Sequence, residues 1–136
     1  MSGKEYIQPK ELFDGQSFGF SQVVTSQPGK LVFISGQVAY NSKFELVGES
    51  DLKLQAEQAL RNVSYALKAA GASHSDVTMM RANIVNLKPE HGEILSGPLS
   101  DFFGDNPPSA STWVGVTSLA AEGILIEIEA IAVIGN

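Results

Sequence analysis

A small set of polar residues near the C-terminus has the types and spacing that chemistry requires. In the run "ILIEIEAIAVI", Glu127 and Glu129 are two residues apart, so both carboxylates point to one side of a strand. Upstream, "SASTW" places the hydroxyls of Ser111 and Thr112 directly before Trp113. A carboxylate can orient or deprotonate a water molecule, and hydroxyls can hold a ligand beside it. The pattern is compatible with polar catalysis that needs neither a metal nor a cofactor.

Other kinds of catalysis find little support in the sequence. The chain has no cysteine, which excludes disulfides, thiolate chemistry and cysteine-based metal sites. His74 and His91 stand alone, and we expect both at the surface because two isolated histidines do not make a metal site. The segment "SGQ", which begins at Ser35, predicts a tight turn and not part of a Ser-His-Asp arrangement.

Charge and hydropathy limit the possible partners. The 136 residues carry 9 Lys and Arg against 15 Asp and Glu, a net charge of −6, and no Lys or Arg follows Lys88. Nucleic-acid binding depends on clustered cations, so nucleic acid is not an expected partner. No apolar run approaches the roughly 18 residues of a membrane helix, and no signal-peptide pattern begins the chain. We expect residues 1–136 to form one cytoplasmic domain.

The elements that must position these residues follow from periodicity and turn signals. We expect, in chain order, strands at 20–26 and 30–40, a loop with a short strand at 41–50, a helix at 51–70, a strand at 76–87, a helix within 88–108, and strands at 111–119 and 124–134. The intervening "QPG" is a hairpin-type turn signal between the first two strands. Ser50 is the expected N-cap of the first helix, and Gly71 ends it. Gly92, Gly97 and Pro98 interrupt the second helix.

This order predicts an α+β fold in which two helices pack on one face of a mixed sheet. The last strand predicts the two faces. Its even positions form an apolar face for the helices to cover: Ile124, Ile126, Ile128, Ala130, Ala132 and Ile134. Its odd positions mix acidic and aliphatic residues: Glu127, Glu129, Ile131 and Val133. This mixture indicates a subunit interface that contains a cleft.

Three segments, "LVFISGQVAY", "QAEQALRNVSYALKAAGASHSDV" and "GILIEIEAIAVI", resemble the RidA/YjgF family in order and spacing. The resemblance extends from Phe20 to Ile134. It implies a chorismate-mutase-like fold and a homotrimer whose sheets form a central barrel, with ligand sites in the clefts between subunits. The best-known members of this family are deaminases that convert 2-imino or 2-enamino acids to 2-keto acids and ammonia.

The resemblance also implies residue roles. In the deaminases, an arginine binds the substrate carboxylate, and a backbone carbonyl and a glutamate place the hydrolytic water. The arginine position falls on Ser111, followed by Thr112, and the carbonyl position falls on Trp113. The glutamate matches Glu127. The cleft aromatic and the pocket turn match Phe20, Ser35 and Gly36.

Serine at the arginine position changes the expected ligand. A guanidinium binds a carboxylate through two charge-assisted hydrogen bonds, whereas Ser111 offers one neutral donor. The chain therefore resembles an arginine-lacking branch of the family, and a neutral or cationic ligand suits the site better than an anion. Two functions stay open: hydrolysis of an imine, an enamine or a related metabolite, and a catalytically silent trimer that binds a small metabolite or a protein partner. An endoribonuclease or translation-inhibitor function conflicts with the acidic charge.

Each candidate also has a structural interpretation. Glu127 and Glu129 can be polar residues of a subunit interface, and Ser111 and Thr112 can be ordinary strand residues. Trp113 is expected as core or interface filler more than as a ligand-stacking ring. Arg81 can lend a cation to the cleft, although a solvated or salt-bridged arginine is the preferred interpretation.

Overall fold

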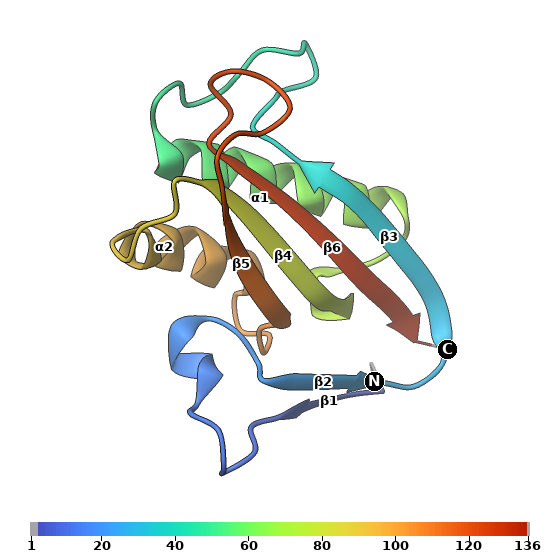
Figure 1. Ribbon diagram of the computed structural model, residues 1–136. Coiled ribbons are helices and arrows are strands. Elements are labelled where there is room, and N and C mark those ends of the chain that lie inside the picture. Colours follow the sequence, from blue (N-terminus) through green and yellow to red (C-terminus); the bar gives the residue numbers. More distant parts are fainter. Residues whose placement is uncertain (1–2, 136) are drawn as a thin grey trace.

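The main body of the protein is a four-stranded sheet with two helices on one face (Figure 1). The computed structural model describes residues 3–135. The strand order is β3-β6-β4-β5, where β3 is Gly29–Gln37, β4 is Val77–Val85, β5 is Ala110–Val116 and β6 is Ile126–Gly135. Strand β6 lies antiparallel to both β3 and β4, and β5 runs parallel to β4. The expected mixed sheet with helices on one face is therefore confirmed.

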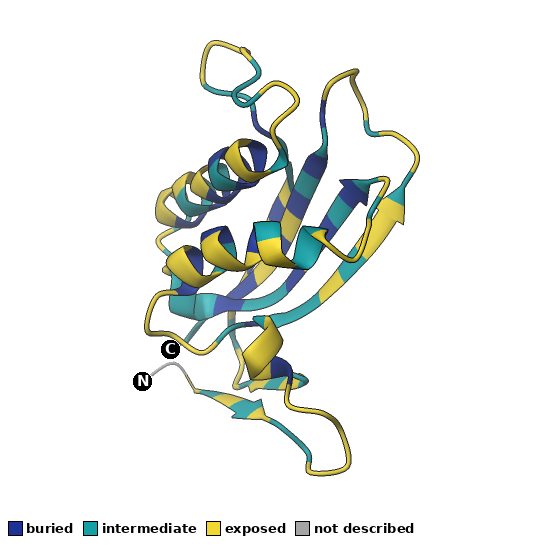
Figure 2. Ribbon diagram, turned by 90° about the vertical axis from the view of Figure 1, so that its left-hand side faces the viewer, coloured by how far each residue is buried: buried dark blue, intermediate teal, exposed yellow. Residues whose placement is uncertain are grey.

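The core lies between the sheet and helices α1, Leu52–Ala69, and α2, His91–Phe103 (Figure 2). From α1, the side chains that enter the core follow helical spacing: Ala56, Ala59, Leu60, Val63 and Leu67. They meet the predicted apolar face of β6, on which Ile126, Ile128, Ala130 and Ala132 are buried. These side chains recur every three to four residues on the helix and every two residues on the strand. Their burial supplies most of the hydrophobic stabilisation.

The structure corrects one prediction for each helix: the N-cap of α1 and the interruption of α2 at Pro98. The N-cap of α1 is Asp51, not Ser50: the Asp51 carboxylate accepts a hydrogen bond from the Leu54 N–H at 3.0 Å. Aspartate is as good a cap as serine, so the helix begins one residue later than predicted. Helix α2 continues through Pro98, because burial of that ring, together with Leu95 and Phe102, offsets its missing N–H.

The predicted hairpin between residues 20–26 and 30–40 is wrong. Strand β2, Val23–Ser26, pairs instead with an N-terminal strand that the sequence did not predict, β1, Lys4–Ile7. Together they form a separate two-stranded arm beside the sheet (Figure 1). The arm continues into the 3-10 turn η1, Gly15–Phe18, while the remaining short 3-10 turn, η2 (His74–Asp76), leads into β4. The short strand expected within residues 41–50 does not form. Leu46 makes an isolated β-bridge with Tyr40 instead.

A buried lysine fastens the arm to the sheet. The Lys4 side chain is fully buried; its Nζ donates to the Val133 carbonyl at 2.6 Å and lies 3.9 Å from Asp76 Oδ1. Beside it, the Tyr6 hydroxyl donates to the Ser75 carbonyl at 3.3 Å. Burial, and then the negative charge of Asp76, raise the pKa of Tyr6. The arm is thus held by polar contacts to the end of β6 and to η2.

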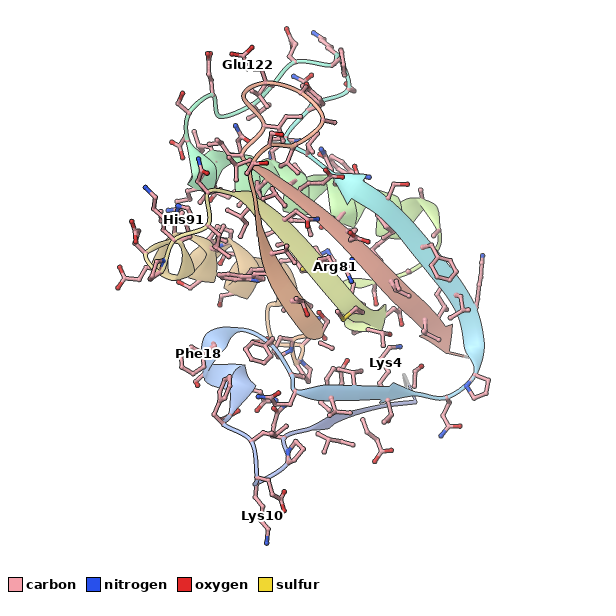
Figure 3. All side chains as sticks on the ribbon, in the orientation of Figure 1. Lys4, Lys10, Phe18, Arg81, His91 and Glu122 are labelled. Atoms are coloured by element: carbon pink, nitrogen blue, oxygen red, sulfur yellow. The ribbon has the colours of Figure 1, made fainter. Side chains whose placement is uncertain are left out.

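Replacement of Lys4 by methionine is expected to lower the free energy of unfolding by about 2 kcal/mol, because a buried charge-assisted hydrogen bond is lost while the apolar stem is kept. Chemical denaturation measures this loss, and amide exchange in β1 should accelerate. Lys10→Met is the matched control, since Lys10 is exposed at the tip of the arm (Figure 3). Equal stabilities of the two variants would contradict the proposed fastening.

Among the described residues, neither helix is long and apolar enough to cross a membrane.

Candidate functional site

The uncovered face of the sheet carries the charged residues of β4 and β6. By register, Glu129 faces Arg81 and Glu127 faces Asn83, so all four side chains lie on the side opposite the helices. Arg81 lies on the open sheet (Figure 3). Its Nη1 is 4.0 Å from Glu129 Oε1, and both side chains are about half exposed. Arg81 is therefore salt-bridged to Glu129, as the preferred interpretation of the sequence expected, in a long and half-exposed ion pair.

Glu127 lies against a bulge in β3. The pairing of β3 with β6 shifts register between Ile34 and Gln37, and the bulged residues are Ser35 and Gly36. A Cβ atom on Gly36 would collide with the Glu127 carboxylate, so only glycine leaves room for the carboxylate in this position. Within residues 3–135, no hydrogen bond or ion pair engages the carboxylate. The structure thus holds a half-buried, unpaired carboxylate beside two backbone units of a bulge.

Strand β5 divides its predicted site residues between the two faces. Ser111 pairs with the buried Met80, and Trp113 pairs with Ala82, so both share the helix-covered side. Trp113 packs against the hydrophobic core. Thr112 pairs with Arg81 and is exposed on the same face as Glu127. From the strand spacing of about 4.8 Å and the rise of about 3.3 Å per residue, the Cα atoms of Thr112 and Glu127 are about 12 Å apart.

Phe20 lies at the start of β5. The next residue, Ser21, donates its N–H to the Ser109 carbonyl at 2.9 Å and its hydroxyl to the Pro108 carbonyl at 2.5 Å. A Cβ on Gly15 would lie 2.6 Å from the Phe20 ring, so glycine is needed where the ring packs on η1. These contacts fix Phe20 near the foot of the strand that carries Ser111 and Thr112.

Two further aromatic residues, which the sequence analysis missed, join Phe20. The Phe13 ring meets Phe20 edge-on at 5.9 Å and Phe18 edge-on at 5.6 Å. We name these three residues the aromatic cluster. Phe13 and Phe18 are 62% and 68% exposed, and Phe18 extends outward from the arm (Figure 3). The only sequence signal was the density of phenylalanine in "LFDGQSFGF".

One chain therefore carries two half-sites. The first consists of Ser35, Gly36 and Glu127, at one end of β6. The second, at the foot of β5, consists of the aromatic cluster with Thr112; Ser111 precedes Thr112 on this strand but points to the helix-covered side. Because the two groups lie at different places on the sheet, a single subunit does not bring them together.

The histidines and an open groove lie elsewhere. His74 stacks on Phe102 at 4.3 Å and shares a hydrogen bond with Ser64 at 2.8 Å, and His91 Nδ1 accepts from the Lys88 N–H at 3.1 Å. These contacts stabilise local structure. Among residues 3–135, no group of three His, Cys, Asp or Glu is arranged to hold a metal ion. A groove of about 430 Å³ lies between the start of α1 and helix α2, on the helix side.

A mixed four-stranded sheet, covered on one face by two helices and carrying an unpaired glutamate on the other, defines a small α+β protein of the chorismate-mutase-like type. The chain belongs to the RidA/YjgF family. The model of that family, described as endoribonuclease L-PSP, matches residues 16–134.

Similar proteins include one described as of unknown function and one named for a deamination reaction. A Rid-family protein of unknown function from Yersinia pestis, YyfB, has a crystal structure that superposes with a TM-score of 0.94 at 36% identity, covering 97% of this chain and 99% of that one. A 2-iminobutanoate/2-iminopropanoate deaminase of Dermatophagoides farinae is 32% identical over 115 residues, 85% of each chain. A RutC family protein of Pyrococcus horikoshii is 32% identical over 115 residues, 83% of this chain and 85% of that one.

Proposed function

We propose that the protein is a homotrimeric hydrolase that cleaves the C–N bond of a small imine or enamine lacking a carboxylate. Its sites lie in the clefts between subunits, where Glu127 is the catalytic residue and Thr112, the Trp113 carbonyl, Phe20, Ser35 and Gly36 line the ligand. Ser111, which points to the helix-covered side, borders the ligand from the edge of the sheet at β5. The observation that carries the proposal is the unpaired Glu127 carboxylate against the Gly36 bulge. The partners are a second and a third copy of this chain and a small molecule, in the cytoplasm, without nucleic acid.

The uncovered face of the sheet supports the trimer. Leu31 and Phe33 of β3 are 58% and 72% exposed, and the neighbouring Ile131 of β6 is 37% exposed. Adjacent exposed apolar side chains on a sheet face are typical of an association surface. Association of this face with other copies would cover these residues and bring one chain's Glu127 half-site to another chain's β5 half-site.

The reaction needs a positioned water and one carboxylate. Water adds to the carbon of the protonated imine; its proton passes to Glu127, and the C=N electron pair moves to nitrogen. Glu127 then returns the proton to the nitrogen, and the C–N bond breaks with its electron pair on the departing ammonia. As the carbonyl forms, the hydroxyl proton passes to Glu127 and from there to the ammonia. The products are a carbonyl compound and ammonium. An unpaired carboxylate suits this proton transfer because no ion pair with a cation lowers its tendency to accept a proton.

Ser111 supports a substrate without a carboxylate. A neutral hydroxyl gives about 1 kcal/mol, whereas charge-assisted hydrogen bonds give about 1.5–3 kcal/mol. Arg81 stands on the Glu127 face but is paired to Glu129. A 2-imino acid would therefore meet carboxylates without an unpaired guanidinium to anchor it.

Imines generated in situ test the function. A flavin amine oxidase supplies phenylmethanimine from benzylamine, and an amino-acid oxidase supplies 2-iminopropionate from alanine. The protein is expected to accelerate the loss of phenylmethanimine and to leave 2-iminopropionate near its uncatalysed rate of hydrolysis.

Two variants test the residues of the site. Glu127→Gln should lower turnover by a factor of about 10² to 10⁴, the usual contribution of a general base. Ser111→Arg should raise turnover of 2-iminopropionate about tenfold or more.

Three outcomes would contradict the proposal. Acceleration of neither imine would favour the catalytically silent trimer. A Glu127→Gln variant with full activity would remove that residue from the mechanism. A trimeric Ser111→Arg variant without added activity on 2-iminopropionate would show that more than the anchor differs from the deaminases.

A further inference from the structure

We propose that the ligand of this cleft is a planar organic cation of the amidinium or iminium type, held between the aromatic cluster and Glu127. The inference deepens the proposed function and rests on it for the trimeric cleft, in which the two half-sites meet. It concerns which ligand binds, and it does not depend on whether turnover follows.

The first observation is the exposed ring surface at the foot of β5. Phe13 contacts Phe18 and Phe20 at interplanar angles of 89° and 84°, so the rings present surfaces in different directions. Two of the three rings are more than half exposed. Rings that project from a soluble protein at an angle to one another form the kind of surface that binds organic cations, since each ring face carries partial negative charge.

The second observation is the sign of the charge around both half-sites. Asp14 directly follows Phe13 and caps η1 by accepting from the Gln16 N–H at 2.9 Å. Glu127 has no cationic partner among residues 3–135, and the nearby Arg81 is paired to Glu129. A cation entering the cleft gains from a carboxylate and from the ring faces together, whereas an anion is repelled by both.

The third observation is rigidity. The Phe20 ring packs where Gly15 has no side chain, and the Ser21 hydrogen bonds fix the segment to Pro108 and Ser109. Gly36 similarly leaves the room that the Glu127 carboxylate occupies. The Phe20 ring is therefore placed before the ligand arrives, and the space at Gly36 sets where the Glu127 carboxylate lies, which favours a flat, rigid ligand over a flexible one.

Hydrogen bonding adds a further reason to prefer an amidinium or iminium. Carboxylates such as that of Glu127 accept hydrogen bonds, and planar nitrogen cations offer N–H donors in their plane while their faces stack on aromatic rings.

Three probes of nearly equal shape separate charge from size: benzamidine, a cation; benzamide, neutral; and benzoate, an anion. Calorimetric titration of the trimer, confirmed by light scattering, is expected to show benzamidine binding at least tenfold more tightly than the other two. Binding should weaken with added salt. Benzoate or benzamide binding as tightly as benzamidine would overturn the proposal, and so would a chain that does not form trimers.

Variants test both halves of the cleft. Phe18→Ala and Glu127→Gln are each expected to weaken benzamidine binding at least fivefold. Tyr65→Ala and Glu93→Gln are matched controls on the helix side, both exposed, and should bind benzamidine unchanged. Loss of the trimer in Phe18→Ala would show that the cluster is a subunit contact and would overturn the proposal.

The two proposals fail separately. Cation-selective binding without imine hydrolysis would reject the catalytic function and keep the ligand class. Hydrolysis of phenylmethanimine without cation-selective binding would keep the function and reject the ligand class.

Discussion

Replacing Gln55 by alanine is expected to lower the free energy of unfolding by about 3 kcal/mol or more. This side chain is completely buried in α1, and its amide nitrogen donates to the carbonyls of Gly48 and Gly123 at 3.1 and 2.9 Å. Its amide oxygen accepts from the Leu125 N–H at 2.8 Å. Truncation breaks three hydrogen bonds of about 1 kcal/mol each. It leaves the Gly123 carbonyl and the Leu125 N–H without this partner, while the Gly48 carbonyl still accepts from the Asp51 N–H at 3.0 Å.

Two further variants separate hydrogen bonding from packing. Gln55→Leu keeps most of the volume and should be nearly as unstable as Gln55→Ala, because the backbone groups still lack partners. Gln37→Ala is the matched control, since its amide makes one exposed hydrogen bond to the Ser35 carbonyl, and its loss should cost at most about 0.5 kcal/mol. Urea denaturation measures all three, and full stability of the leucine variant would show that packing is decisive.

Gln55 also matters for the candidate site, because it joins three segments that are far apart in sequence. Leu125 comes two residues before Glu127, and Gly123 begins the turn into β6. The same amide holds Gly48, at the end of the loop after β3. Loss of Gln55 is therefore expected to loosen the entry to β6, from which the Glu127 carboxylate projects.

The sequence predicted the parts of the fold that depend on local period. The alternation along β6 correctly separated a buried face from a mixed one, because successive side chains of a strand point to opposite faces and the residue type reflects the environment of each face. The three- to four-residue spacing in α1 and the stop at Gly71, which has a φ of 79°, were correct for the same reason. In these elements, a residue's environment depends mainly on its immediate neighbours.

The parts that failed depend on distant partners. The turn at "QPG" separates β2 from β3, but it does not determine that β3 pairs with β6, about 100 residues later. Strand β1 was missed because "KEYI" has two charged residues, and burial of Lys4 becomes favourable only when Val133 and Asp76 are in place. Likewise, α2 tolerates Pro98 because tertiary packing buries the ring.

The candidate site was predictable in composition and less so in geometry. The family resemblance selected Glu127 and Gly36, which the structure brings together. The face on which Ser111 lies follows from the parallel register of β5 with β4, and no local pattern encodes that register. The contribution of Phe13 depends on the turn at Gly15, which places its ring against Phe20.

The second large effect is expected from Gly36→Ala, which should lower imine hydrolysis about 100-fold. The added methyl group occupies the space of the Glu127 carboxylate, and a displacement of about 1 Å at a catalytic group can cost a factor of that size. The free energy of unfolding should change by less than about 1 kcal/mol, because the displaced atoms end a flexible side chain. Turnover and urea denaturation of the same preparation measure the two effects.

The double variant decides whether Gly36 acts through Glu127. If glycine only makes room for the carboxylate, Gly36→Ala adds nothing once Glu127→Gln has removed the charge, so the two losses are strongly non-additive. Gly97→Ala is the control: apart from its chain neighbours and the helix's own backbone, nothing lies within 4 Å of the added Cβ, and alanine inside α2 should stabilise the helix by roughly 0.5–1 kcal/mol with turnover unchanged. Losses that multiply in the double variant would mean that Gly36 contributes to the cleft independently of Glu127, through the backbone of the bulge.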